Sequence, residues 1–234
     1  IPTYNESENI GRLIDEILDL PVYTKIVVVD DNSPDGTADV VKNHPEFDKR
    51  VYLLLRETDK GRGRAGIAGF QYALEAGADY IVEMDADFSH HPKYIPQLVQ
   101  EMENADIVIG SRGVKGGYET GRSLARQWIT KFANFYIRLF MGIKGINDCT
   151  AGFRCFKREV LEKVRLEKME SVGPSIVEEV LYGCCFLGYT IKEIPICFED
   201  RTEGESTKNL GEYIDTAICI IKFRLRMNAD FFKT

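Results

Sequence analysis

Two aspartates one residue apart, Asp85 and Asp87, are the side chains of this sequence best suited to hold a metal ion. They come at the end of an apolar segment, residues 79–85, that is predicted to form a β-strand. Side chains two residues apart on a strand point to the same side, so the carboxylates are expected to converge on one cation. Paired oxygens suit a hard ion, which predicts a site for Mg²⁺ or Mn²⁺. Solvated aspartate pairs are also common at strand ends, so this pair needs support from other residues.

Strand and helix patterns alternate along the first half of the chain, which predicts an α/β fold with a mainly parallel sheet flanked by helices. In such sheets ligands bind beyond the carboxyl ends of the strands. Because Tyr4, Asp31 and the Asp85–Asp87 pair all fall at such ends, three polar loops are expected to converge on one crevice. The expected strands are Lys25–Asp30, Val51–Arg56, 79–85, Asp106–Gly110, Phe153–Phe156 and Tyr189–Phe198, and the expected helices are 6–20, a short one from Thr37, 64–77, 92–103, 121–142, 157–163, 175–187 and about 209–226.

Composition argues against several classes of protein. The net charge of −7 does not suit a general nucleic-acid binder. The six cysteines form no C-x-x-C pair and have no histidine at metal-binding spacing, which argues against a zinc site and favours buried thiols in a reducing compartment. The sequence shows no signal peptide and no apolar run of the ~18 residues that a membrane span needs. It opens on Ile1–Thr3, and Tyr4–Glu6 resembles a strand-to-helix loop, so we expect most of the preceding strand to be missing from this sequence.

Two polar motifs each have two interpretations. Asp31–Gly36 begins like a calcium loop, but Lys42 stands where an EF-hand needs a bidentate glutamate. It is either a turn stabilised by its own side chains or a set of acceptors for a base and a ribose. Gly61–Gly66 reads G-x-G-x-x-G but follows the third strand, whereas a dinucleotide fingerprint follows the first. A phosphate-binding loop beside Lys60, Arg62 and Arg64 is therefore favoured over a nicotinamide or flavin site.

Residues 121–142 are predicted to form a basic, aromatic helix. The stretch Gly121–Gly145 contains five basic residues and no acidic one, in a protein whose net charge is negative. This composition is typical of a helix that meets anionic lipid headgroups, with core packing as the alternative. The charged loop 200–208 is either solvated or able to close over phosphates through Arg201 and Lys208.

Taken together, several segments resemble one known family. They are Ile1–Glu6, Val28–Thr37, Met84–Asp87, Gly110–Arg112, Asp148–Arg154 and Asp200–Lys208, in this order. The chain is similar to the inverting glycosyltransferases of family two, which have the GT-A fold, and most of all to the dolichyl-phosphate mannose synthases. It departs from their usual pattern where Arg62 and Arg64 flank Gly63, since the loop often reads G-L-G, and where Ser89 replaces a glutamine found in some members.

The resemblance implies a role for most of the polar residues named above. It implies that Pro2, Tyr4, Glu6 and Asp31, with Asp35 beside them, line the base and ribose of a nucleotide-sugar. Asp85 and Asp87 would hold the metal and the donor diphosphate, with Asp87 the more direct ligand. Arg112, Arg126 and Thr130 would bind the acceptor phosphate, and Asp87, Arg112 and Arg126 would be catalytic. Arg201 and Lys208 would close over the donor, while the roles of Asp148, Arg154, Glu178 and His90 stay open.

The activity implied is transfer of mannose from GDP-mannose to dolichyl or polyprenyl phosphate, with inversion, by a peripheral enzyme on the cytoplasmic face of a membrane. One catalytic domain is expected, with a nucleotide-sugar half (1–110), an acceptor half (111–208) and a C-terminal amphipathic helix (209–234). A phosphate monoester is already largely anionic at neutral pH, because its second pKa is ~6, so no catalytic base is required. Three alternatives stay open: a related enzyme using UDP-glucose, a non-catalytic binding module, and an oxidoreductase using the G-x-G-x-x-G.

Overall fold

The computed structural model describes residues 1–200, 210–228 and 230–232, and the side chains of 210–215 are not considered. Its strands confirm the expected α/β fold, although one strand of the second sheet runs antiparallel to its neighbours. The first sheet is parallel, in the order β1 (Pro2–Thr3), β2 (Ile26–Asp30), β3 (Val51–Leu55). The second has the order β4 (Tyr80–Glu83), β7 (Arg154–Lys157), β5 (Ile107–Ser111), β8 (Ile191–Pro195), and β6 (Tyr118–Thr120) pairs with β9 (Cys197–Glu199).

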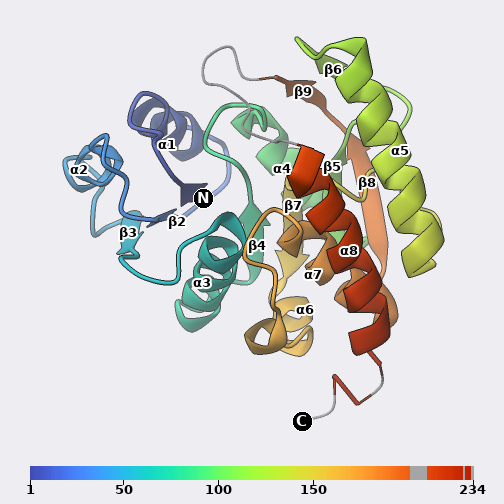
Figure 1. Ribbon diagram of the computed structural model, residues 1–234. Coiled ribbons are helices and arrows are strands. Elements are labelled where there is room, and N and C mark those ends of the chain that lie inside the picture. Colours follow the sequence, from blue (N-terminus) through green and yellow to red (C-terminus); the bar gives the residue numbers. More distant parts are fainter. Residues whose placement is uncertain (201–209, 229, 233–234) are drawn as a thin grey trace.

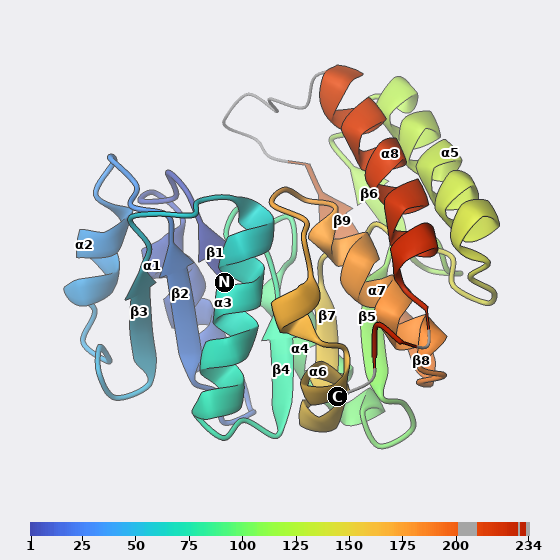
Figure 2. The same cartoon turned by 60° about the horizontal axis from the view of Figure 1, so that its bottom comes forward.

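Helices cover these sheets, and the two larger sheets lie side by side with α3 in front of the place where they meet (Figure 2). The first predicted helix, within 6–20, is confirmed, and its Ile10, Leu13, Ile14 and Ile17 are all buried. The helices are α1 (Ile10–Leu18), α2 (Thr37–Lys42), α3 (Arg62–Glu75), α4 (Ile95–Glu101), α5 (Leu124–Met141), α6 (Arg158–Lys163), α7 (Ile176–Phe186) and α8 (Leu210–Arg226), with 3-10 turns at Pro92–Tyr94 and Leu166–Lys168.

Parallel pairing brings the ends of neighbouring strands to one edge. In the first sheet Thr3 lies opposite Asp30, and Asp30 lies opposite Leu55. The loops that follow these strands therefore begin at the same level, as expected for a crevice at the carboxyl ends. In the second sheet β4 and β5 both pair with β7, so this sheet contains strands from both sides of residue 110, the predicted boundary between the two halves. The division into a nucleotide half and an acceptor half stays a prediction about function.

Two strand predictions are wrong in detail. The segment 79–85 leaves the sheet after Glu83, because its partner strand β7 begins at Arg154 and the preceding carbonyl, of Phe153, accepts from Gly110 on β5 instead. The segment 189–198 forms two strands, β8 and β9. The chain turns away from β5 after Pro195 and pairs with β6, a short strand that the sequence did not predict.

Helices α5 and α8 pack side by side, with α5 on the outside of the molecule (Figure 1). The Tyr136 hydroxyl of α5 donates a hydrogen bond of 3.1 Å to the carbonyl of Ala217 in α8. The outer surface of α5 carries exposed apolar side chains, among them Trp128 and Phe132. Within the described residues, no helix combines the length and the apolar character needed to cross a bilayer.

A partly buried ion pair joins the first turn of α3 to the end of β4. The Arg62 guanidinium lies 2.5 Å from Glu83 Oε1 and 3.1 Å from Asp85 Oδ1. Space is tight close by, because a Cβ on Gly66 would lie 3.2 Å from Arg62 Nη1 and 3.3 Å from Glu83 Oε1. Burial alone would lower the pKa of Arg62, but Glu83 and Asp85 raise it above its ordinary value. The guanidinium is therefore charged and compensated.

Replacing Arg62 by leucine should destabilise the protein, because Glu83 would be left buried without its cation. We expect the free energy of unfolding to fall by about 3 kcal/mol, as is typical when one partner of a buried pair is removed. Chemical denaturation would measure it. The double variant Arg62→Leu/Glu83→Gln should recover most of the loss, and an Arg62→Leu variant as stable as the parent would show that the pair contributes nothing to folding.

Candidate active site

Backbone amides tie the loop after β1 to the loop after β2. The bonds run from Asn5 to Ser33 Oγ, from Glu6 to Thr37 Oγ1 and from Ser7 to Asp35 Oδ2, over 2.9–3.0 Å. Burial opposes ionisation of Asp35, but hydrogen bonds from Thr37 and Ser7 prevail and lower its pKa to about 2. The first two of the three expected loops therefore converge, and in this structure Asp35 fastens them together.

The carboxylate of Asp31 is buried and already shared by two donors. It accepts hydrogen bonds of 2.6 Å from Arg56 Nη1 and from the amide of Gly61. Asp31 thereby joins the ends of β2 and β3 to the start of α3. Near this carboxylate Pro2 pairs with Val29 in the sheet, whereas Tyr4 is 59% exposed. The carbonyl of Thr3, just before Tyr4, accepts from the amide of Asp31, so an exposed aromatic ring and a buried carboxylate lie on adjacent loops, an arrangement that can stack a base and orient a ribose.

Asp85 and Asp87 lie in the loop beyond β4, not on the strand, so the pleat does not account for their placement. Hydrogen bonds orient them instead. Asp85 Oδ1 accepts from Arg62 Nη2 at 3.1 Å. Asp87 Oδ1 accepts from the amide of Ser89 at 3.1 Å and from its hydroxyl at 2.6 Å. Ser89, at the position where some family members carry glutamine, thus orients the carboxylate expected to be the more direct metal ligand.

His90 supports the same loop from below. Its Nδ1 accepts a hydrogen bond of 3.1 Å from the amide of Asp85, and its ring stacks on Phe153 at a centroid distance of 5.2 Å. Burial lowers the pKa of His90, against the opposing charges of Asp85 and Asp87, which favours the neutral ring. With Nδ1 as the acceptor, that ring carries its proton on Nε2.

The two aspartates fit a divalent ion as a partial ligand set. No group of three His, Cys, Asp or Glu side chains that could enclose a metal occurs among the residues described. Mg²⁺ and ions like it are commonly bound through one or two carboxylates, with water and substrate phosphates completing the shell. Asp85 and Asp87 are both half-buried, which leaves their oxygens within reach of a ligand.

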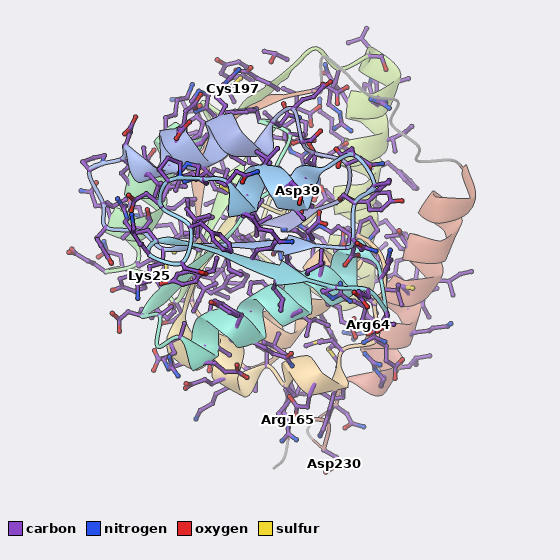
Figure 3. All side chains as sticks on the ribbon, turned by 90° about the vertical axis from the view of Figure 1, so that its left-hand side faces the viewer. Lys25, Asp39, Arg64, Arg165, Cys197 and Asp230 are labelled. Atoms are coloured by element: carbon purple, nitrogen blue, oxygen red, sulfur yellow. The ribbon has the colours of Figure 1, made fainter. Side chains whose placement is uncertain are left out.

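The glycines of the G-x-G-x-x-G serve contacts within the protein. A Cβ on Gly61 would lie 2.7 Å from the carbonyl oxygen of Val172, and one on Gly63 would lie 2.2 Å from that of Ser171. Arg64, labelled near the start of α3 in Figure 3, donates to the Met169 carbonyl at 3.2 Å. Close packing on residues 169–173 therefore accounts for these glycines without a bound dinucleotide.

On the acceptor side, Arg112 is held by Asp148. The guanidinium donates to the two carboxylate oxygens over 2.7 and 2.8 Å, and the Arg112 amide adds a bond of 3.1 Å. Burial would raise the pKa of Asp148, but these hydrogen bonds and the charge of Arg112 lower it to about 2. Thr150 Oγ1 accepts a further bond of 2.8 Å from Arg112. The role of Asp148, open at the sequence level, is to fix this arginine.

The other two expected acceptor residues lie on α5. Arg126 Nη1 donates to Asp200 Oδ2 at 2.8 Å, and Thr130 Oγ1 accepts from Arg122 Nη1 at 3.0 Å. The ring of Phe198 contacts two arginines. Its centroid lies 4.9 Å from the guanidinium carbon of Arg112 and 5.6 Å from that of Arg122.

The same Phe198 ring links the acceptor residues to the aspartate loop. Its centroid lies 5.7 Å from that of His90, which bonds to Asp85. The expected donor and acceptor residues therefore lie along one continuous set of contacts. Arg201 and Lys208, expected to close over the donor, lie outside the described residues. Arg154, whose backbone pairs with Glu83, is fully buried and donates to the carbonyls of Val177 and Cys149, while Glu178 is buried in α7.

Sequence reasoning assigned no role in the site to several residues that the structure brings into it. They are Glu83, His90, Glu119, Arg122 and Phe198, together with Arg62, which was expected near phosphates and instead pairs with Asp85. Two of them left a signal in the sequence. Arg62 departs from the usual G-L-G, and Arg122 belongs to the basic stretch Gly121–Gly145. The others depend on contacts between distant segments.

Comparisons with known proteins show the family to which the chain belongs. Residues 1–165 match the family described as Glycosyl transferase family 2. The chain is 37% identical over 225 residues to an undecaprenyl-phosphate mannosyltransferase of Micrococcus luteus, covering 96% of this chain and 92% of that protein. It is 38% identical over 232 residues to a polyprenol monophosphomannose synthase of Mycolicibacterium smegmatis, covering 98% and 87%.

Solved structures show a similar fold at lower identity. A glucosyl-3-phosphoglycerate synthase of Mycobacterium tuberculosis with phosphoglyceric acid superposes with a TM-score of 0.66 at 20% identity, covering 96% of this chain and 76% of the other. The same enzyme with Mn²⁺, UDP-glucose and glycerol 3-phosphate gives a TM-score of 0.63, at 20% identity and the same coverage. Because the family model spans well over half of the chain, this protein belongs to glycosyl transferase family 2.

Proposed function

We propose that this protein transfers mannose from GDP-mannose to the phosphate of a polyprenyl lipid, with inversion at the anomeric carbon. The observation that carries the proposal is the pairing of an aspartate loop with an arginine cluster around Phe198. One side suits a metal-bound diphosphate and the other suits a second phosphate. The names of the two relatives supply the sugar and the lipid class.

The residues of the site divide the work between the two substrates. Tyr4, Asp31 and the loop fastened by Asp35 receive the nucleoside, and Asp85 and Asp87 would hold a divalent ion. When bound, such an ion supplies positive charge that stabilises a leaving diphosphate. Pro2 and Glu6 lie on the same donor side, where Arg201 and Lys208 are proposed to close.

Arg112, Arg126 and Thr130 would orient the acceptor phosphate toward the sugar. One phosphate oxygen attacks the anomeric carbon in line. The bond between the anomeric carbon and the diphosphate oxygen breaks, and its electron pair leaves with the nucleoside diphosphate. No proton has to be removed, because a phosphate monoester with a second pKa of ~6 is largely a dianion at neutral pH. This agrees with a site in which the nearest histidine, His90, is fixed under the aspartate loop.

The proposal is tested by incubating the protein with Mg²⁺, a polyprenyl phosphate and a panel of labelled nucleotide-sugars that includes GDP-mannose and UDP-glucose. We expect a mannolipid from GDP-mannose, separated by thin-layer chromatography. A glucolipid from UDP-glucose alone would refute the choice of donor but keep the acceptor. Donor binding without any product would mean that the chain is a binding module.

Removing the carboxylate of Asp87 should abolish transfer without unfolding the protein. We expect Asp87→Ala to lower kcat by roughly 10²–10³-fold, the usual cost of one electrostatic group in such a site. Excess EDTA should stop the parent enzyme, and Mn²⁺ binding followed by electron paramagnetic resonance should weaken in the variant. The matched control is Asp19→Ala, which removes an exposed carboxylate at the end of α1. Full activity in EDTA would contradict the metal assignment.

We also propose that the exposed face of α5 rests on an anionic membrane, which places the protein at the cytoplasmic surface beside its lipid acceptor. Five large apolar side chains of this helix are more than half exposed: Leu124, Trp128, Phe132, Phe135 and Leu139. Lys131, which is exposed on the same helix, supplies positive charge that would attract anionic headgroups. The six unpaired cysteines are compatible with a reducing compartment.

The double variant Trp128→Ser/Phe132→Ser should bind anionic vesicles more weakly, because it removes two exposed rings from the face of α5. Co-sedimentation with vesicles containing phosphatidylglycerol would measure the loss, which we expect to be at least tenfold, since burying each ring contributes roughly 1.5–3 kcal/mol. Tyr23→Ser is the control, since Tyr23 is 79% exposed but lies just before β2. Equal binding by the double variant and the control would contradict this orientation.

A further inference from the structure

We propose that Arg122 is a third arginine of the acceptor-phosphate site, acting beside Arg112 and Arg126. This inference rests on the proposed function and assigns a further substrate contact within the same site. Arg122 stands immediately before the N-cap residue Ser123, so it belongs to the loop that leads into α5. Its side chain turns inward, toward β6 and β9, and is only 16% exposed.

The contacts of Arg122 place it between two of the three residues already expected to bind phosphate, Thr130 and Arg112. Its Nη1 donates to Thr130 Oγ1 at 3.0 Å and to Glu119 Oε1 at 3.2 Å. The same Glu119 oxygen lies 3.5 Å from Arg112 Nη1. Arg122 and Arg112 therefore share one carboxylate and contact one aromatic ring, that of Phe198. The two guanidinium groups form a pair held by Glu119.

Arg122 also has donor capacity that the protein does not use. Its Nε is buried and has no hydrogen-bond partner in the described part of the chain, and the same holds for Glu119 Oε2. A buried N–H without an acceptor is costly, so native structures rarely leave one without a reason. Arg112, in contrast, donates through Nε and Nη2 to Asp148 and Thr150. Of this pair, Arg122 has the unmet need for an acceptor oxygen.

The surroundings of this N–H favour an anion. The first turn of α5 contains no acidic residue, and its Ser123 cap occupies only the amide of Arg126. The start of an 18-residue helix carries partial positive charge, which adds to that of the arginines before and within its first turn. A phosphate monoester offers three oxygens, enough to accept from Arg122 Nε while also contacting Arg126 and Thr130.

The test measures steady-state kinetics of Arg122→Met with GDP-mannose and a short, water-soluble prenyl phosphate in the absence of membranes. Methionine keeps apolar packing on Phe198 but removes the charge and the donors. We expect the acceptor KM to rise ~10-fold (about 1.4 kcal/mol) while the donor KM changes little. Arg122→Lys, which keeps the charge, should recover part of the loss. Arg158→Met, which removes a guanidinium paired with Glu162 on α6, is the control.

The result that would overturn the inference is an acceptor KM in Arg122→Met equal to that of the parent. A rise in both KM values together would also overturn it, because a merely structural role would affect the two substrates alike. If Arg122→Met does not fold, Arg122→Gln is judged by the same criteria, since its amide can still reach Thr130. An inactive parent enzyme would instead defeat the proposed function, so the two failures are distinguishable.

Discussion

The site depends on the pairing of partly buried arginines with carboxylates. Two substrates that both carry phosphate have to meet in it, so cations are needed on either side of the reacting atoms. A cation withdrawn from water without a partner would be costly, and a nearby carboxylate offsets that cost. Arg62 is held by Glu83 and Asp85, and Arg112 is held by Asp148. The positive groups are therefore in position before either substrate binds.

Aromatic rings separate the two charged clusters. The rings of His90 and Phe198 lie between the aspartate loop and the arginines, and Phe153 packs beneath His90. An aromatic ring has little conformational freedom once buried, so it fixes the spacing between the groups on its two sides. The ring of Phe198 also contacts two guanidinium groups, which are favourable partners for an aromatic face. The side chain of Phe198 thus both fixes the spacing of the two clusters and contacts the charged groups of one of them.

Local patterns in the sequence predicted most of the fold. The segments that form β2 and α1 were predicted correctly because burial on one or both sides dictates their apolar patterns directly. The convergence of the loops after β1 and β2 followed from parallel pairing. The partners of the charged residues did not follow, because Arg62 meets Glu83 across 21 residues and Arg112 meets Asp148 across 36. Such choices depend on how sheets and helices approach one another.

The strand errors have the same origin. Residues 79–85 and 189–198 are continuous β patterns, and each leaves its sheet where a partner strand ends or changes. Strand ends are set by the neighbour as much as by the strand itself, since an unpaired segment gains no ladder hydrogen bonds. The consequence for the site is direct. Asp85 and Asp87 lie in a loop outside the sheet, and hydrogen bonds with Arg62, Ser89 and His90 fix its shape.

Helix α5 has one face toward the candidate site and another toward the proposed membrane surface, as its residue spacing dictates. Arg126, Thr130 and Asn134 recur every four residues and therefore share the inner face, where Asn134 accepts from the amide of Cys149. Trp128 and Phe132, two positions away, point outward. One helix thus presents the proposed phosphate-binding groups inward and apolar groups outward within its first three turns. In the proposed orientation a lipid phosphate at headgroup depth reaches the arginines while its hydrocarbon chain stays in the bilayer, so no lipid has to be extracted for the sugar to be transferred.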